Sequence, residues 1–283
     1  MNNICAVVVT YNRIELLKEL INSLRSQTIK LEKIIIVNNG SLDYTGNWLA
    51  QQKDLFVIEQ ENTGSSGGQY TGIKSAYELN MEWIWVMDDD VIPELNCLEK
   101  LIQKISYNRI HAPLRYSNEN IPYLNDVKYF NLTNPFKSLW QSILTNKDIV
   151  EEYISAEGIT FEGPIFHRSL IEKIGLPEKN FFIYGDDTEF FIRAKKSGFD
   201  IYIVRDAKSH RKLPVSDLRE KFDWKHYYII RNIIAIDVIH GNLAVRLFRP
   251  IGYFIKWLFR CHNTDNLKIT FKAFIDGYFY KSK

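Results

Sequence analysis

Three consecutive aspartates, Asp88, Asp89 and Asp90, follow the apolar run WIWVM at residues 83–87. Adjacent carboxylates repel one another, and burying them without partners is costly or shifts their pKa values. Side chains alternate between the two faces of an extended strand end, so we expect Asp88 and Asp90 on one face and Asp89 on the other. Two carboxylates on one face suit a hard divalent cation such as Mg²⁺ or Mn²⁺. The alternative is a solvated acidic turn before Pro93.

A second acidic pair, Asp186 and Asp187, stands at the start of the helical pattern DDTEFFIRAKK. Acidic residues stabilise helix N-termini by capping and through the helix dipole, and one carboxylate is enough for that role. The pair follows a glycine, downstream of the segment GPIF, and it leaves one carboxylate free to serve as a general base.

The third candidate is His210, which follows a predicted strand at residues 200–206 and lies between lysine and arginine residues. It is either an ordinary surface histidine in a basic loop or a further ligand of the Asp88 and Asp90 site, because imidazole suits Mn²⁺. The other histidines show no spacing typical of metal ligands.

The Gly-rich stretch NTGSSGG, residues 62–68, precedes a predicted helix at 67–80. Such a turn can bring backbone N–H groups close to a phosphate or a sugar. Its spacing matches neither the dinucleotide-binding fingerprint nor the P-loop, which also requires a lysine. Taken alone, it could equally be a flexible loop.

The elements that must position these residues alternate between strands and helices, which predicts an α/β fold with a largely parallel sheet. The predicted strands of the first half are residues 4–10, 33–39, 55–60 and 83–87. Each is followed by a polar cluster, and parallel sheets bind ligands at the carboxyl ends of their strands. The second half adds an interrupted strand at 159–166, an amphipathic helix within 181–198, and helices from Trp224 onward. We therefore expect a composite site at one sheet edge.

Length and composition limit the classes of protein that the chain can be. With 283 residues, of which 46% are hydrophobic and 25% charged, it can form one large α/β domain with a small appendage. Three widely spaced cysteines predict cytosolic thiols rather than disulfides or a zinc site. The N-terminal residues lack a secretory pattern, and no apolar run approaches the ~20 residues of a membrane span. We expect an intracellular protein that does not span a membrane.

The C-terminal segment, residues 243–283, is basic and aromatic. It carries a net charge of +6, which leaves −4 for residues 1–242. Apolar residues recur there at helical spacing between lysines and arginines, a pattern typical of helices that lie in the interface of an anionic membrane. The alternative is an apolar stripe that packs on the main domain or forms a dimer contact. A base-reading module is not recognisable, so nucleic-acid binding fits poorly.

The ordered set VVVTYNR, IIIVNNGSLD, the aspartate run, GPIF and GDDTEFFIRAKKSGFDIY resembles the family 2 glycosyltransferases with the GT-A fold. The resemblance covers roughly residues 4–212 and implies a catalytic domain at 1–222 with a helical extension at 223–283. It implies an inverting transferase that uses a nucleotide-diphosphate sugar and a divalent cation.

The resemblance also implies roles for single residues. Thr10 and Tyr11 would line the nucleotide pocket, and Asn38 would face the base. Family members often have Asp at that position, but the Asn38 oxygen can still accept the N–H of uracil or thymine. Together the donor-site positions are Thr10, Tyr11, Asn12, Arg13, Asn38, Asn39, Gly67, Gly68 and Asp89.

The same resemblance assigns the charged groups. Asp88 and Asp90 would bind Mn²⁺ or Mg²⁺ together with His210. Asp187 would be the general base, with Asp186 as the first carboxylate of the family's acidic pair. Asp89 and a turn at Gly67–Gly68 would face the donor sugar. A metal-dependent phosphotransferase would need a lysine or P-loop at the strand ends, which the sequence does not clearly offer.

Two features narrow the subgroup. The unbroken aspartate run and the segments NTGSSGGQYTG and HYYIIRN resemble bacterial galactofuranosyltransferases and rhamnosyltransferases. The expected donor is UDP-galactofuranose, with dTDP-rhamnose or a catalytically inactive sugar-nucleotide-binding relative as alternatives. The expected acceptor is a hydroxyl of a lipid-linked cell-surface glycan precursor, which would place the protein at the inner face of the cell membrane.

Overall fold

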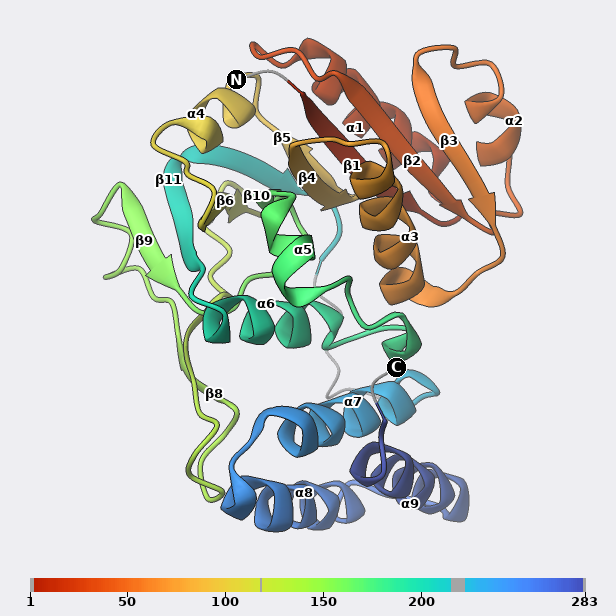
Figure 1. The fold of residues 1–283 in the computed structure, drawn as a ribbon. Coiled ribbons are helices and arrows are strands. Elements are labelled where there is room, and N and C mark those ends of the chain that lie inside the picture. The colour runs from red at the N-terminus through yellow and green to blue at the C-terminus, as the bar shows by residue number, and fades with distance from the viewer. Residues whose placement is uncertain (1–2, 118, 215–221, 282–283) are drawn as a thin grey trace.

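The structure is a computed structural model that describes residues 3–117, 119–214 and 222–281 (Figure 1). The strands in these ranges are β1 (Ile4–Thr10), β2 (Lys33–Asn39), β3 (Leu55–Gln60), β4 (Trp83–Asp88), β5 (Val91–Pro93), β6 (Arg109–Tyr116), β7 (Val127–Phe130), β8 (Trp140–Ile143), β9 (Tyr153–Ala156), β10 (Ile165–His167) and β11 (Asp200–Arg211). The helices are α1 (Ile14–Ser26), α2 (Thr45–Leu49), α3 (Gly64–Glu78), α4 (Cys97–Ile102), α5 (Ser169–Ile174), α6 (Asp186–Lys196), α7 (Lys225–His240), α8 (Leu243–Leu258) and α9 (Thr264–Tyr278), with a 3₁₀ turn η1 at Lys179–Phe181.

The main sheet has the strand order β3-β2-β1-β4-β10-β6-β11-β5, with β9 paired to β11. Strands β1 to β4 are parallel, whereas β10 runs antiparallel to β4 and β6. Thr10 lies opposite Asn38, and Val9 lies opposite Asp88. The polar ends of β1, β2 and β4 are therefore level at one edge, as the sequence predicts.

Helices cover both faces of the sheet. Alternate residues of β1 point to opposite faces, which is why the whole strand is buried. Val8 packs with α1 and α4 on one face, and Val7 packs with α3 and α6 on the other. The four α1 residues whose helical spacing the sequence shows are all buried in this core: Leu17, Leu20, Ile21 and Leu24.

The last three helices form a separate layer below α6 in Figure 1. Ala235 and Ile236 of α7 share a core cluster with Ile192 of α6, and α8 and α9 pack against α7. Helical structure from Trp224 onward is thus confirmed, while a division into domains at residue 222 stays a prediction. Within the described ranges, we find no helix long and apolar enough to cross a membrane.

Three predicted boundaries are wrong. The strand expected at 159–166 is formed only at Ile165–His167, because Gly163 adopts a φ of +105° and Pro164 has no N–H to donate to a ladder. His210 lies within β11 rather than after it, since β11 continues to Arg211 and pairs there with β5. The helix expected from residue 67 begins earlier, at Gly64.

Candidate active site

Asp89 connects the end of β4 to the end of β1. Its carboxylate accepts hydrogen bonds from Thr10 Oγ1 at 2.8 Å and from Arg13 Nη1 at 3.0 Å. Thr10 and Asp89 are buried, so this contact is shielded from water. Asp89 is therefore held by a hydroxyl and a guanidinium at the end of β1.

Asp88 and Asp90 lie in a cluster of carboxylates. Gln69 Nε2 on α3 donates to Asp88 Oδ1 at 2.9 Å. Burial raises the pKa of Asp88, and the charges of Asp90 and Glu162 raise it further. Burial and the charge of Glu162 also raise the pKa of Asp90, whose nearest cations, Arg13 and Arg211, lie 3.9 Å away. Negative charge thus accumulates at this edge of the sheet.

The chemistry of this cluster fits a hard divalent cation. Asp88 and Asp90 supply carboxylate oxygens, which Mg²⁺ and Mn²⁺ prefer, and a diphosphate and water can complete the coordination. His210 is not directed to them: its Nε2 lies 3.0 Å from Glu94 Oε1. No group of three or more His, Cys, Asp or Glu residues in the described ranges is arranged to hold a metal. A role for His210 as a ligand stays a prediction.

The ends of β1 and β2 are held together by side-chain hydrogen bonds. Asn12, which has a positive φ, accepts from Leu42 N at 2.6 Å, and its own N–H donates to Ser41 Oγ at 3.0 Å. Asn38 donates to Glu59 Oε2 at 2.7 Å, so its oxygen points the other way, toward Ser41 N at 3.3 Å. Tyr11, which lies between Thr10 and Asn12 in the sequence, is half-exposed.

Asn39 is occupied by the loop that follows β3. It donates to Gly64 O at 2.9 Å and accepts from Thr63 N at 3.2 Å. These contacts give Asn39 a structural part in the site, holding the start of α3. Its contact with a donor, like that of Thr10, Tyr11, Asn12, Arg13 and Asn38, stays a prediction.

Gly67 and Gly68 do not form a turn, and that expectation is wrong. Both are buried within the first turns of α3. A Cβ at Gly68 would lie 2.4 Å from Val9 Cγ1, so glycine lets α3 approach β1 closely. Gly64 is equally constrained, with a φ of +74° and the carbonyl oxygen of Phe182 where a Cβ would stand. The glycines place α3 against the sheet and against the segment before α6.

Asp186 and Asp187 begin α6 after a strained turn. Phe182, Tyr184 and Gly185 all have positive φ values, 66°, 63° and 84°. The two non-glycine residues are costly in this conformation and need support from their surroundings. That support comes from Asn232 of α7, which is 1% exposed. Its side-chain nitrogen lies 2.7 Å from the carbonyl oxygen of Tyr184, 2.8 Å from that of Ile183 and 3.0 Å from that of Phe181.

The environment of the pair favours proton uptake. Burial raises the pKa of Asp186 to about 7, and the charge of Asp187 adds to this effect. Burial likewise raises the pKa of Asp187 to about 6, and Glu162 adds to it. A carboxylate whose pKa lies near neutrality can accept a proton and release it again, which is the requirement for a general base.

Glu162 connects the two acidic groups. It forms ion pairs with Arg115 and with Arg211, the latter at 3.4 Å. Arg115 is buried and also pairs with Asp126 at 2.6 Å. Fixed cations thus hold Glu162 where its charge raises the pKa values of Asp88, Asp90 and Asp187.

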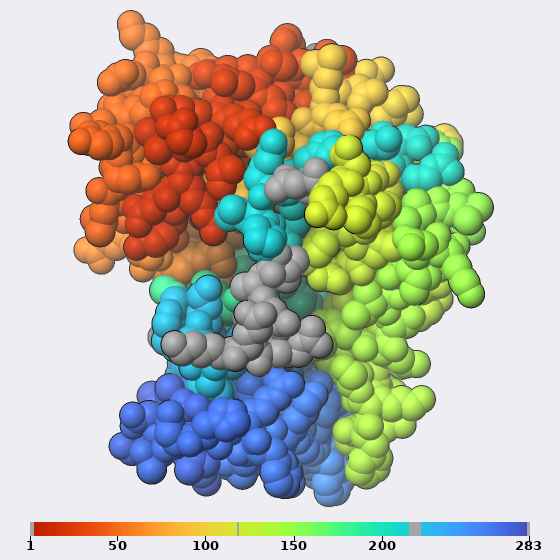
Figure 2. All heavy atoms as spheres, turned by 180° about the vertical axis from the view of Figure 1, so that it is seen from behind, coloured from red at the N-terminus to blue at the C-terminus, as the bar shows by residue number. Residues whose placement is uncertain are grey.

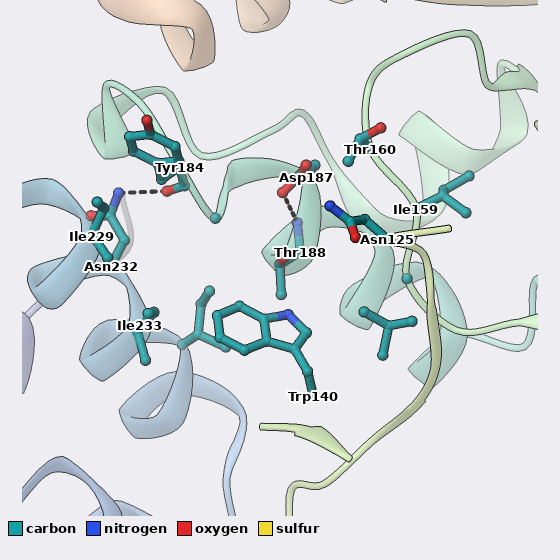
Figure 3. Close-up of a pocket in the computed structure, with 14 residues that line it drawn as sticks. Asn125, Trp140, Ile159, Thr160, Tyr184, Asp187, Thr188, Ile229, Asn232 and Ile233 are labelled. Carbon is teal, nitrogen blue, oxygen red and sulfur yellow. Dashed lines mark hydrogen bonds between the residues drawn. The ribbon is translucent and has the colours of Figure 1, made fainter. Parts of the chain in front are cut away.

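A cavity of about 330 Å³ lies beside Asp187 (Figure 3). Its lining is mainly apolar, and the large apolar side chains include Trp140 of β8, Ile159 before β10, and Ile229 and Ile233 of α7. Asp187 accepts a 2.5 Å hydrogen bond from the N–H of Thr188 and lies at the upper side of this cavity in Figure 3. A hydroxyl-bearing ligand in the cavity would meet a base at its edge.

Comparison with known proteins identifies the family. A family model described as "Glycosyl transferase family 2" matches residues 5–175, which is more than half of the chain. The chain belongs to glycosyltransferase family 2. This confirms the resemblance seen in the strand-end motifs.

The family 2 transferase is similar to curated proteins of different sugar specificity. It is 25% identical over 205 residues to galactofuranosyltransferase GlfT1 of Mycolicibacterium smegmatis, covering 69% of this chain and 66% of that protein. It is 21% identical over 230 residues to the O-antigen chain rhamnosyltransferase RfbN of Salmonella typhimurium, covering 78% and 70%. The chain thus spans just under two thirds of GlfT1.

Solved structures show the same fold. GalNAc-T7 crystallised with UDP, GalNAc and Mn²⁺ superposes with a TM-score of 0.69 at 13% identity. The superposition covers 100% of this chain and 55% of GalNAc-T7. S. aureus TarS in complex with UDP-GlcNAc superposes with a TM-score of 0.60 at 15% identity, over 98% and 82%. The fold is therefore GT-A, as predicted.

Sequence reasoning missed four residues of this site: Gln69, Arg115, Glu162 and Asn232. Glu162 directly precedes Gly163-Pro164, a break that marks a functional bend, and Asn232 ends the segment HYYIIRN. Gln69 and Arg115 stand inside ordinary helix and strand patterns, so nothing in the sequence distinguishes them.

Proposed function

We propose that this family 2 glycosyltransferase transfers a sugar from a UDP-sugar to an acceptor hydroxyl with inversion at the anomeric carbon. The observation that carries the proposal is the position of Asp187, a partly buried carboxylate of raised pKa at the edge of a cavity. The charge of Glu162 acts both on this base and on Asp88 at the end of β4. A base on one side and a diphosphate site on the other is the arrangement that single displacement requires.

The donor would bind along the ends of β1, β2 and β4. Thr10, Tyr11 and Asn38 supply the nucleotide side of this edge. The crystal structures of GalNAc-T7 with UDP and of TarS with UDP-GlcNAc support the choice of nucleotide. Asp88 and Asp90 would hold a divalent cation, Mn²⁺ or Mg²⁺, whose charge neutralises the leaving diphosphate.

The chain's own residues carry the proton. Asp187 removes the proton of the acceptor hydroxyl as the hydroxyl oxygen forms a bond with the anomeric carbon. The bond from that carbon to the diphosphate oxygen breaks, and its electron pair leaves with UDP. Attack from the face opposite the leaving group inverts the configuration, and no covalent enzyme intermediate is needed. The strained turn before α6, held by Asn232, keeps the base in place.

The sugar that we propose is galactofuranose, with rhamnose from dTDP-rhamnose as the second candidate. The similarity to GlfT1 supports the first and the similarity to RfbN supports the second. In both cases the acceptor would be a glycan precursor, and we propose that it is lipid-linked and reached from the inner face of a membrane. The apolar lining of the cavity, with Trp140 and the α7 isoleucines, favours an acceptor that is not purely polar.

A donor screen tests this proposal. The purified chain would be incubated with a panel of UDP- and dTDP-sugars with Mn²⁺, Mg²⁺ or a chelator, and nucleotide release would be measured. We expect cation-dependent release from UDP-galactofuranose above all other donors. Release from dTDP-rhamnose alone would establish the second candidate, and tight UDP binding without release from any donor would indicate an inactive relative.

A further inference from the structure

Helix α8 exposes a row of large apolar side chains that the rest of the structure does not cover. They recur at intervals of four residues through α8 and the residue after it: Leu243, Leu247, Ile251, Ile255 and Phe259. Residues four apart are neighbours on a helix surface, so the middle members Leu247, Ile251 and Ile255 lie along one side of α8. The opposite side faces the protein, where Val245, Arg249 and Pro250 are buried. The row therefore faces away from the core, and Phe259 is 85% exposed.

Helix α9 carries a second row of the same kind. Its exposed members are Leu267, Phe271, Ile275 and Phe279, again four residues apart, the last following the end of the helix. The ring of Phe271 lies 4.9 Å from that of Phe254 on α8, so the two helices meet along this side. We call the two rows together the α8–α9 face.

This face lies at one end of the molecule. In Figures 1 and 2 the helices α8 and α9 form the end opposite α1 and β1. Helix α7 lies between these two helices and the α/β part. The loop between β7 and β8 reaches the same end, where the N–H of Asn242 donates to Leu132 O at 3.0 Å. Phe136 of that loop is 91% exposed. Apolar side chains from three segments thus gather at the same end.

The exposure excludes one of the three explanations that the sequence leaves open, the packing of the apolar stripe on the main domain. An apolar stripe that packed on the α/β part would be buried there, and these side chains are not. Contiguous exposed apolar patches larger than a few hundred Å² are rare on monomers and usually mark an interaction surface. Within the described part of the chain, the face therefore has the character of an interaction surface.

The charges on the two helices indicate which occupant. Arg246, Lys256, Lys268 and Lys272 are exposed on α8 and α9 beside the apolar rows. Between Leu243 and Lys281 the chain has seven Lys or Arg residues and two Asp residues. A twofold dimer would bring this basic surface against an identical one, which is unfavourable. An anionic bilayer offers the complementary charge and an apolar interior.

We propose that the α8–α9 face docks on the surface of an anionic lipid bilayer, with the two apolar rows inserted among the acyl chains. The basic side chains then lie at the level of the lipid headgroups. The bilayer would be the surface on which the protein meets its acceptor. The docking proposal rests on the proposed function only in this point, that the acceptor is lipid-linked. Helix α7 would connect the two sites, because Ile229 and Ile233 line the cavity beside Asp187 while Ile230 and Ile234 contact α9.

Vesicle co-sedimentation of the full chain, without nucleotide or acceptor, tests the docking surface independently of catalysis. Vesicles of phosphatidylcholine alone would be compared with vesicles that also contain phosphatidylglycerol. We expect binding to the anionic vesicles, weakened by added salt. The triple variant Leu247→Gln, Ile251→Gln, Ile255→Gln should reduce binding about tenfold or more. The matched control is Val150→Gln, an apolar residue that is 76% exposed in the loop before β9.

Each outcome decides the proposal. The charge variant Lys256→Glu with Lys268→Glu should lose the preference for anionic vesicles while its circular dichroism and Tm stay unchanged. Equal binding by the triple variant, or no binding of the wild-type chain to either vesicle, would overturn the proposal. Self-association in sedimentation velocity that the triple variant abolishes, without vesicle binding, would assign the face to a second copy instead. Sugar transfer to a water-soluble acceptor would remain intact in all these variants if only the docking surface is affected.

Discussion

The side-chain nitrogen of Asn232 lies 2.7 Å from the carbonyl oxygen of Tyr184, three residues before Asp187. Tyr184 has a φ of 63°, a conformation that is unfavourable for a tyrosine. Asn232 belongs to α7, and Arg231 beside it donates to the carbonyl oxygen of Phe181 at 3.0 Å. The C-terminal helices thus have a direct part in shaping the turn that presents the candidate base, and they are more than an appendage.

Replacing Asn232 should therefore impair turnover rather than donor binding. In Asn232→Ala the turn before α6 loses its clamp, and Asp187 moves from its working position. We expect kcat to fall by about 10- to 100-fold, with KM for the donor little changed. Steady-state kinetics at a temperature well below Tm measures the effect. The control is Asn131→Ala, a buried asparagine in the β7–β8 loop that makes similar backbone contacts. An equal loss of kcat in both variants would show that the effect is only destabilisation.

The pKa of Asp187 sets the pH dependence. Burial raises that pKa to about 6, so the base is lost by protonation as the pH falls through this value. We expect kcat/KM to rise with pH on an acid limb near pH 6. Between about pH 4 and about pH 6 the native state binds more protons at Asp187 than the unfolded state does. The free energy of unfolding should therefore fall as the pH rises through this range, while kcat/KM rises. Glu162→Gln removes a negative charge near Asp187 and should move the acid limb to lower pH. A limb that stays in place would contradict the assignment.

The two carboxylates that we propose as cation ligands predict how UDP binds. Isothermal titration with UDP should give a higher affinity with Mn²⁺ than with a chelator. In Asp88→Asn and in Asp90→Asn the affinity with Mn²⁺ should drop to the value measured with the chelator. Asp54→Asn, a surface aspartate paired with Arg25, serves as the control and should behave like the wild type. Cation-dependent binding that survives in both variants would exclude these ligands.

A buried ion pair holds the C-terminal layer together. Arg249 of α8 donates to Asp237 of α7 at 3.0 Å, both are buried, and Arg249 also donates to Asn131 O at 2.7 Å. Arg249→Met leaves Asp237 buried without its partner and should lower the free energy of unfolding by about 3–5 kcal/mol. Urea unfolding measures the change. Adding Asp237→Asn should restore part of the loss, and two variants that destabilise additively would show that the residues do not act as a pair.

The sequence was sufficient for the first half of the sheet, β1 to β4, because these strands are short, apolar and followed by polar residues, whereas β5, β6 and β9 were not predicted. Burial on both faces leaves little choice for runs such as residues 4–10, and their level carboxyl ends follow from parallel pairing. The errors at element boundaries have identifiable physical causes. Gly64 lies in α3 because the chain there passes Phe182 closely, a tertiary contact that the Gly-rich composition does not show.

The site was predictable only where one residue type implies a chemistry. The aspartate run and the Asp186–Asp187 pair stand out by charge, whereas Gln69 and Asn232 act through contacts between segments that are distant in sequence. His210 stands out in the sequence by its residue type, but its contacts depend on the length of β11. The strand runs from Asp200 to Arg211, and the His210 ring contacts Glu94. No local pattern contains that geometry.

The most direct test of the account is transfer by Asp187→Asn. This variant keeps the shape of the side chain but cannot accept the acceptor proton. With UDP-galactofuranose and a hydroxyl acceptor, we expect the transfer rate to fall by about 10³-fold while UDP binding, measured by titration, stays at the wild-type value. Transfer at the wild-type rate would contradict the assignment of Asp187 as the base, and with it the central claim.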